Sequence, residues 1–173
     1  MNHKWYAVWT RSRHEFVAAG ELERKGFTIF LPTVDKLSSR KDRRKVYTAP
    51  LFPGYLFVQT EMDTEHYVRI VRSVGVAQVL GYHMGKADPV REEEIESIKI
   101  ILDGKIPVED HPFLPEGSHV RVLTGPLKGV VGILKEYRGK RRIVVQVELL
   151  RQAIACELTL ADVVPIETIS LLK

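Results

Sequence analysis

The segment TAPLFPGYLFVQT, Thr48–Thr60, combines a turn signal with a strand that has no polar face. Its proline-glycine pair is typical of a tight turn, because proline fixes φ and glycine tolerates positive φ. In the strand that follows, Leu56 and Val58 point to one face and Tyr55 and Phe57 to the other. A sheet that contains this strand must therefore be covered on both sides.

Outward from this strand, strand and helix patterns alternate over residues 1–103. Aromatic and β-branched runs predict further strands, and apolar residues at helical spacing predict helices. The expected strands are Lys4–Thr10, Phe27–Thr33 and Val76–Tyr82, and the expected helices are Arg13–Lys25, Thr64–Val71 and Arg91–Leu102. This order predicts an α+β domain with a four-stranded, mainly antiparallel sheet and three flanking helices.

The segment Lys36–Lys45, KLSSRKDRRK, precedes the opening stretch and carries six basic residues and one acidic residue. Two interpretations stay open for it: a mobile arm that reaches nucleic acid or a protein partner, and a solvated hairpin.

The pattern changes after residue 103. Residues 103–117 hold three prolines and two glycines, which indicates a stiffened linker. Short β-rich runs follow, separated by glycines and charged residues, as in a small all-β barrel. The expected organisation is an N-terminal domain over 1–103, a linker over 104–116 and a barrel domain over 117–168.

Composition limits which partners, cross-links and cellular compartments are compatible with this protein. The chain has 173 residues, a formal net charge of +4 and a pI near 9.2, which is compatible with a polyanionic partner. Its single cysteine, Cys156, excludes an intramolecular disulfide and fits a reducing compartment. No apolar run approaches the roughly 18 residues that a membrane span requires. We expect a cytoplasmic monomer without membrane contact.

Catalytic and metal sites are not predicted. Three consecutive glutamates, Glu92, Glu93 and Glu94, open a predicted helix, where the helix dipole favours negative charge. The histidines lack the spacing of a metal site or a catalytic triad. We expect no enzyme activity, no cofactor and no metal.

Two sets of motifs resemble known families. GSHVRVLTGPLKGVVGILKEY, Gly117–Tyr137, resembles the KOW motif of an SH3-like barrel, although any such barrel with a glycine turn would share part of it. WYAVWTRSRHE, FLPT, PLFPGYLFV and RSVGVAQVLG occur in the order found in the N-terminal (NGN) domain of the NusG family. The segment PLFPGYLFV is most similar to that of the specialised RfaH/UpxY-like paralogues.

The resemblance implies a transcription regulator that binds RNA polymerase and promotes processive elongation or antitermination at a subset of operons. Two alternatives stay open: a housekeeping NusG-type elongation factor, and a KOW-based module that binds RNA or the ribosome. The family's partners are the clamp helices of RNA polymerase, non-template DNA in the transcription bubble and, through the KOW domain, a small-subunit ribosomal protein or Rho.

The resemblance also implies an aromatic patch that docks on the clamp helices and a second contact across the polymerase cleft. The candidate polymerase-binding residues are Trp9, Phe52, Pro53, Tyr55, Phe57 and His66. Alternation alone favours a simpler interpretation, in which the aromatic side chains are core beneath the third helix. The family resemblance favours partner contact for Phe52 and Tyr55.

A basic face is the candidate for nucleic acid. It comprises Arg11, Arg13, His14, Lys25, Arg72 and Ser73. Arginine suits both phosphate contact and stacking on unpaired bases, while the alternative is an ordinary solvated surface. Glu21 and Val74 stand where an RfaH-like reader has polar groups that contact bases.

The tip of the predicted barrel carries Leu149, Leu150 and Arg151, the candidates for binding the KOW partner. Housekeeping NusG often has Phe-Gly-Arg at this place. The segment LLRQAIACELTLADVV has some helical character, so a barrel that refolds is one hypothesis. The dense Val and Ile of RRIVVQVEL favour a standing β-barrel instead.

Overall fold

The computed structural model describes residues 3–38, 45–111, 119–137, 140–158 and 163–166. The chain forms two compact units, Met1–Val90 and Arg91–Lys173. None of the helices in the described ranges has the length and apolar character that crossing a membrane would require.

A four-stranded sheet forms the centre of the first unit. Its strand order is β2-β5-β1-β6 and every neighbouring pair is antiparallel. The strands are β1 (Lys4–Thr10), β2 (Thr28–Phe30), β5 (Tyr55–Thr60) and β6 (Val76–Val79). The register pairs Trp9 with Tyr55 and Val8 with Leu56, so the two faces alternate as predicted. The predicted α+β class is confirmed.

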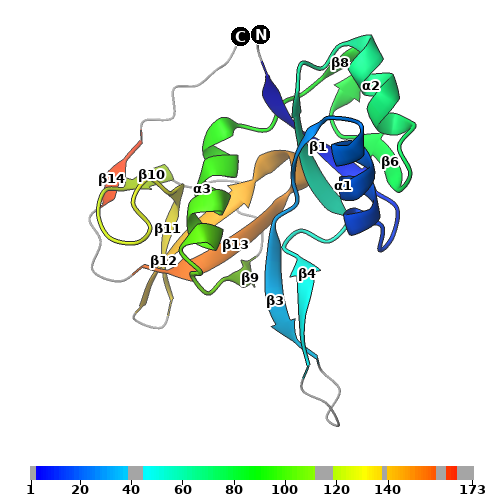
Figure 1. Ribbon diagram of the computed structural model, residues 1–173. Coiled ribbons are helices and arrows are strands. Elements are labelled where there is room, and N and C mark those ends of the chain that lie inside the picture. The colour runs from blue at the N-terminus through cyan, green and yellow to red at the C-terminus, as the bar shows by residue number, and fades with distance from the viewer. Residues whose placement is uncertain (1–2, 39–44, 112–118, 138–139, 159–162, 167–173) are drawn as a thin grey trace. The chain divides into compact units, whose positions relative to one another are not determined.

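Two helices, α1 (Glu15–Arg24) and α2 (Thr64–Val71), supply apolar side chains to one face of this sheet (Figure 1). Leu22 and Ile70 from the helices join Val8, Leu56 and Val58 from the strands in one buried cluster. Burial of such side chains from water is the main stabilisation of the unit.

The buried side of α1 agrees only in part with the expected one. Helical spacing predicts an apolar stripe of Phe16, Val17, Ala19 and Leu22. Ala19 and Leu22 are buried, whereas Phe16 and Val17 are exposed. Ala18 is buried as well, because a small alanine lets the helix lie close to the sheet.

Two short hairpins also belong to the first unit. The basic segment is part of an antiparallel pair formed by β3 (Thr33–Leu37) and β4 (Val46–Pro50). Residues 39–44, which include most of its charges, lie outside the described residues. The second pair is β7 (Tyr82–His83) and β8 (Lys86–Ala87), where Tyr82 stacks on Tyr67 of α2 with ring centroids 3.6 Å apart.

The second unit contains a six-stranded antiparallel sheet in the order β14-β10-β11-β12-β13-β9. Its strands are β9 (Glu109–His111), β10 (His119–Val122), β11 (Val131–Tyr137), β12 (Lys140–Val147), β13 (Gln152–Glu157) and β14 (Val163–Pro165). A short 3-10 helix, Glu148–Leu150, joins β12 to β13. This β-rich region is consistent with the predicted KOW-like barrel, and β12 and β13 are strands here, while the refolding hypothesis stays a prediction.

The third helix, α3 (Glu92–Asp103), lies in the second unit and packs against β11 and β12. Its Ser97 hydroxyl accepts a hydrogen bond from the Val131 backbone N–H at 2.9 Å. Its Glu94 carboxylate accepts one from the Glu148 N–H at 3.3 Å. The sequence pattern predicts that this helix flanks the N-terminal sheet. The domain boundaries predicted at 103/104 and 116/117 stay a prediction.

Candidate functional site

The candidate aromatic residues lie on the sheet face opposite to the α1 and α2 cluster. Trp9 and Tyr55 are register partners across β1 and β5, so their side chains are neighbours on this face. Trp9 is 45% exposed and Tyr55 is half-buried, whereas Pro53 is exposed. These three residues offer accessible apolar surface to a partner.

Phe52 and Phe57 differ from Trp9 in exposure. Their exposed fractions are 2% and 0%, and their rings meet edge to face with centroids 6.3 Å apart. Phe57 also stacks on Phe30 at 6.0 Å, and Phe30 meets Trp5 at 6.2 Å. In this structure the two rings are part of a connected aromatic cluster, and their role in binding a partner stays a prediction.

The turn at Gly54 holds this surface in place. Gly54 has a φ of 86°, in the region that favours glycine, and its carbonyl accepts a hydrogen bond from the Thr10 N–H at 2.8 Å. Its own N–H donates to Oε1 of Glu15 at 2.8 Å. Glu15 is buried in the first turn of α1, where the helix dipole also favours its charge. The carboxylate therefore ties the turn to α1, and the Gly54 carbonyl ties it to β1.

Sequence reasoning missed Glu15, and we expect its replacement to loosen the turn. Glu15→Ala should lower the free energy of unfolding by about 1.5–3 kcal/mol, because the Gly54 N–H loses a charged acceptor. Glu15→Gln keeps an acceptor oxygen and should cost less. Urea unfolding provides the measurement, with exposed Glu23→Ala on the same helix as the control. Equal losses for Glu15→Ala and Glu23→Ala would contradict the role given to the carboxylate.

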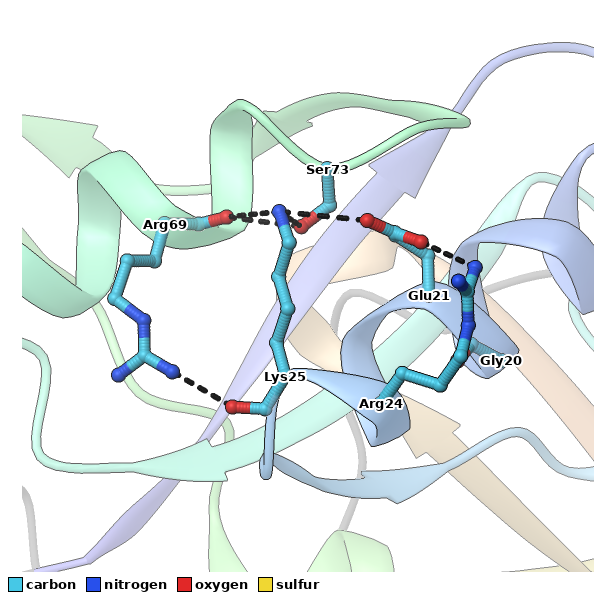
Figure 2. A network of polar contacts seen from close by, with 6 residues as sticks. All are labelled: Gly20, Glu21, Arg24, Lys25, Arg69 and Ser73. Carbon is cyan, nitrogen blue, oxygen red and sulfur yellow. Dashed lines mark hydrogen bonds and ion pairs between the residues drawn. The ribbon is translucent and has the colours of Figure 1, made fainter.

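Two of the candidate nucleic-acid residues, Lys25 and Ser73, belong to a polar network between the ends of α1 and α2 (Figure 2). The Lys25 Nζ donates to the Ser73 hydroxyl at 2.8 Å and to the Arg69 carbonyl at 3.2 Å. The Arg69 guanidinium donates to the Lys25 carbonyl at 2.6 Å and lies 5.0 Å from the centroid of the Phe27 ring. The Lys25 ammonium is also 3.6 Å from Glu21.

This network gives Lys25 and Ser73 a structural task. Ser73 is 4% exposed, and the side chain of Lys25 is 29% exposed. Glu21 also bonds to Arg24, so it offsets part of the positive charge at this end of α1. The two candidates join the helices and support the surface around them.

The other basic candidates are exposed. Arg11, Arg13 and His14 precede α1, and Arg72 follows α2. The Arg11 N–H donates to the Gly75 carbonyl at 2.8 Å, which brings the two loops side by side. Gly75 is required there, since an added Cβ would lie 3.2 Å from His14 and Ala18 at a φ of +87°. The side chains of Arg11, Arg13, His14 and Arg72 are exposed, and their grouping into one nucleic-acid surface stays a prediction.

His66 lies at the start of α2 and takes part in its cap. Asp63 accepts bonds from the His66 N–H at 2.7 Å and pairs with its Nδ1 at 2.8 Å. Hydrogen bonds from His66 lower the pKa of the Asp63 carboxyl. The imidazole also meets Phe27 edge to face at 5.9 Å. His66 thus has a local structural role, and its contact with polymerase stays a prediction.

At the barrel tip the three candidates for the KOW partner differ in exposure. Leu150 is buried, Leu149 is half-buried and Arg151 is exposed, with a φ of 53°. Next to them, Arg91 pairs with Glu148 at 3.2 Å and with Glu94 at 2.6 Å. Burial raises the pKa of the Glu94 carboxyl, against the opposite effect of Arg91. Only Leu149 and Arg151 present accessible atoms to a partner.

The part of the chain that the structure describes contains no group of three or more His, Cys, Asp or Glu side chains suited to a metal. Cys156 is buried, and burial raises the pKa of its thiol to about 11. Its thiol is therefore protonated and unreactive at neutral pH.

Comparison with known proteins matches this chain to one family. The family model described as transcription termination factor nusG matches residues 3–99. Among similar relatives, the transcription termination/antitermination protein NusG of Thermus thermophilus is 28% identical, over 95% of this chain and 99% of its own. That of Pseudomonas aeruginosa is 29% identical, over 94% of this chain and 98% of its own.

The fold comparison agrees. A solved structure on domain interaction in Thermotoga maritima NusG matches with a TM-score of 0.53 and 25% identity. It covers 91% of this chain and 94% of that one.

Proposed function

The chain belongs to the NusG family, and we propose that it docks on RNA polymerase through the surface around Trp9 and Tyr55 as an elongation and antitermination factor. Relatives that match along almost their full length are named transcription termination/antitermination protein NusG. The observation that carries the docking surface is an exposed tryptophan beside a half-buried tyrosine on a turn fixed by Glu15. Tryptophan and tyrosine are the aromatic side chains most enriched among residues that dominate protein interfaces.

The proposed mechanism is mechanical and involves binding only, without catalysis. The aromatic surface holds the clamp helices on one side of the polymerase cleft, and α2 near His66 contacts the other side. A bridged clamp resists the opening that accompanies pausing. Action at a subset of operons, as in RfaH/UpxY-like paralogues, is part of the proposal and rests on the sequence resemblance.

Two further partners complete the proposal. Non-template DNA would lie on the surface of Arg11, Arg13, His14 and Arg72, which is exposed and basic. A small-subunit ribosomal protein or Rho would bind the KOW barrel near Arg151. Lys25 and Ser73 would support the DNA surface indirectly, because their hydrogen bond holds α1 and α2 together.

Retention of RNA polymerase tests the docking surface. We expect Trp9→Ala and Tyr55→Ala each to weaken retention about tenfold or more, with folding intact, because both side chains have accessible area. Met84→Ala, which removes a fully exposed apolar side chain elsewhere in the unit, serves as the control. Folded variants that retain polymerase as well as wild type would refute this surface.

The same experiment distinguishes the alternative in which the KOW domain is the binding module. A KOW-based module that binds RNA or the ribosome would bind bare nucleic acid in a salt-sensitive way and retain no polymerase even as wild type.

A further inference from the structure

The solvent side of helix α1 exposes two large apolar side chains. Phe16 and Val17 are 51% and 49% exposed, although side chains of this kind usually lie in the interior. Helical spacing puts Gly20, Glu23 and Arg24 on the same side, away from the sheet. These five residues are here called the outer face of α1. Two adjacent apolar side chains on one helix face indicate a contact surface rather than scattered surface residues.

Gly20 lies in the middle of the outer face, and the fold gives no reason for a glycine there. Its backbone is helical, and no heavy atom of the described residues would lie within 4 Å of an added Cβ. The Arg24 Nε donates to the Gly20 carbonyl at 3.3 Å, a bond that any residue at position 20 could accept. Glycine weakens a helix interior relative to alanine, but it lets another backbone approach closely. The reason for this glycine therefore lies outside the fold.

The charges around the outer face have opposite signs at its two ends. Arg13 lies just before α1 and Glu23 lies in its last turn, and both side chains are exposed. Within the described part of the chain, neither takes part in an ion pair. The helix dipole disfavours a carboxylate in the last turn, so Glu23 gains from a cation supplied by another molecule.

We propose that two copies of this chain pair through the outer face of α1, with the two helices antiparallel and crossing at Gly20. In a two-fold contact the same surface of each copy meets the other copy. The two glycines let the helix backbones approach closely. Phe16 and Val17 of each copy then pack on the aliphatic stems of the residues in the last turn of the other. This self-association goes beyond the proposed function.

The distribution of charge favours a second copy, in antiparallel orientation, over other occupants. An antiparallel pair brings Arg13 of each copy close to Glu23 of the other and sets the two helix dipoles in opposite directions. A parallel pair would set Glu23 beside Glu23. A nucleic acid suits the outer face less, because Glu23 repels phosphates and two of the five side chains are apolar.

The length of α1 limits the strength of this contact. The helix has ten residues, which corresponds to a length of about 15 Å. A contact confined to it is smaller than a standard protein interface, so the dimer is weak and exchanges its subunits.

Sedimentation equilibrium of the full chain measures the dimer dissociation constant. We expect Phe16→Ala and Gly20→Gln each to raise this constant about tenfold or more, because one removes apolar contact and the other separates the backbones. Glutamine is a good helix former, and position 20 has room for a side chain, so circular dichroism should show an intact fold. Met84→Ala removes an exposed apolar side chain elsewhere in the unit and should dimerise as wild type.

A charge exchange tests the antiparallel arrangement. Arg13→Glu alone brings two carboxylates together at each end of the pair, and Glu23→Arg alone brings two cations together. Each variant should therefore weaken self-association about tenfold or more. An equimolar mixture of the two variants restores opposite charges at both ends, so its dimer constant should return to within about threefold of that of wild type.

Three results would overturn the proposal. The first is a wild type that stays a monomer up to about 1 mM, as the sequence leads us to expect. The second is a dimer that Phe16→Ala and Gly20→Gln leave unchanged, since a different face would then form it. The third is a mixture of the two charge variants that associates no better than either variant alone.

Discussion

Replacing Gly132 with alanine should cost the barrel about 3 kcal/mol or more and disrupt the pairing of β11 with its neighbours. A Cβ at this position would lie 2.5 Å from the Val144 carbonyl oxygen and 2.8 Å from Cγ1 of Ile143. Both atoms belong to β12, which is buried here, and the oxygen is backbone, so the contact cannot be relieved by rotating a side chain. Overpacking of this kind usually costs 1–3 kcal/mol, and a backbone clash lies at the upper end or above.

Two-dimensional amide NMR separates the effect on each unit. In Gly132→Ala we expect dispersed signals from β10 to β13 to weaken or collapse while those of β1 and β5 persist. Gly20→Ala is the opposite control: nothing lies within 4 Å of its added Cβ, and alanine favours a helix by about 1 kcal/mol. A barrel that retains its signals and its stability in Gly132→Ala would contradict the close approach of the two strands.

The order of elements and the two faces of the sheet could be predicted from local patterns. Leu56 and Val58 alternate with Tyr55 and Phe57, and this alternation alone gives the face of each side chain. The observed register between β1 and β5 agrees with it. In the KOW-like segment, Gly129 has a φ of +95° and Gly132 meets β12 closely, which are two of the conditions that call for glycine.

Exposure could not be predicted in this way, because it depends on residues far away in the sequence. Alternation puts Phe57 and Trp9 on the same face, yet Phe57 is buried among other rings and Trp9 is 45% exposed. In the sequence, nothing near Lys25 and Ser73 indicates that they have partners. In the fold, Lys25 bonds to Ser73 and to the carbonyl of Arg69, which is 44 residues away in the chain. Glu15 has no local signal either, since its partner is Gly54.

The stability of Phe57→Ala shows whether the Phe57 ring, one of the predicted polymerase contacts, serves the fold or the partner. We expect a loss of about 3–5 kcal/mol in the free energy of unfolding, because a fully buried ring that stacks on Phe30 and meets Phe52 is removed. Such a loss is a large fraction of the 5–15 kcal/mol typical of a domain. Urea unfolding of the full chain, followed by signals of the first unit, measures it.

Phe57→Leu and Tyr55→Ala provide the comparison. Leucine keeps much of the apolar volume and should cost less than alanine, whereas Tyr55→Ala removes a half-buried ring and should chiefly weaken polymerase retention. If Phe57→Ala loses less than about 1 kcal/mol of stability but fails to retain polymerase, its ring acts on the partner rather than on the fold. If it loses several kcal/mol, the fraction that stays folded should still retain polymerase through Trp9 and Tyr55, since those two side chains carry the accessible surface.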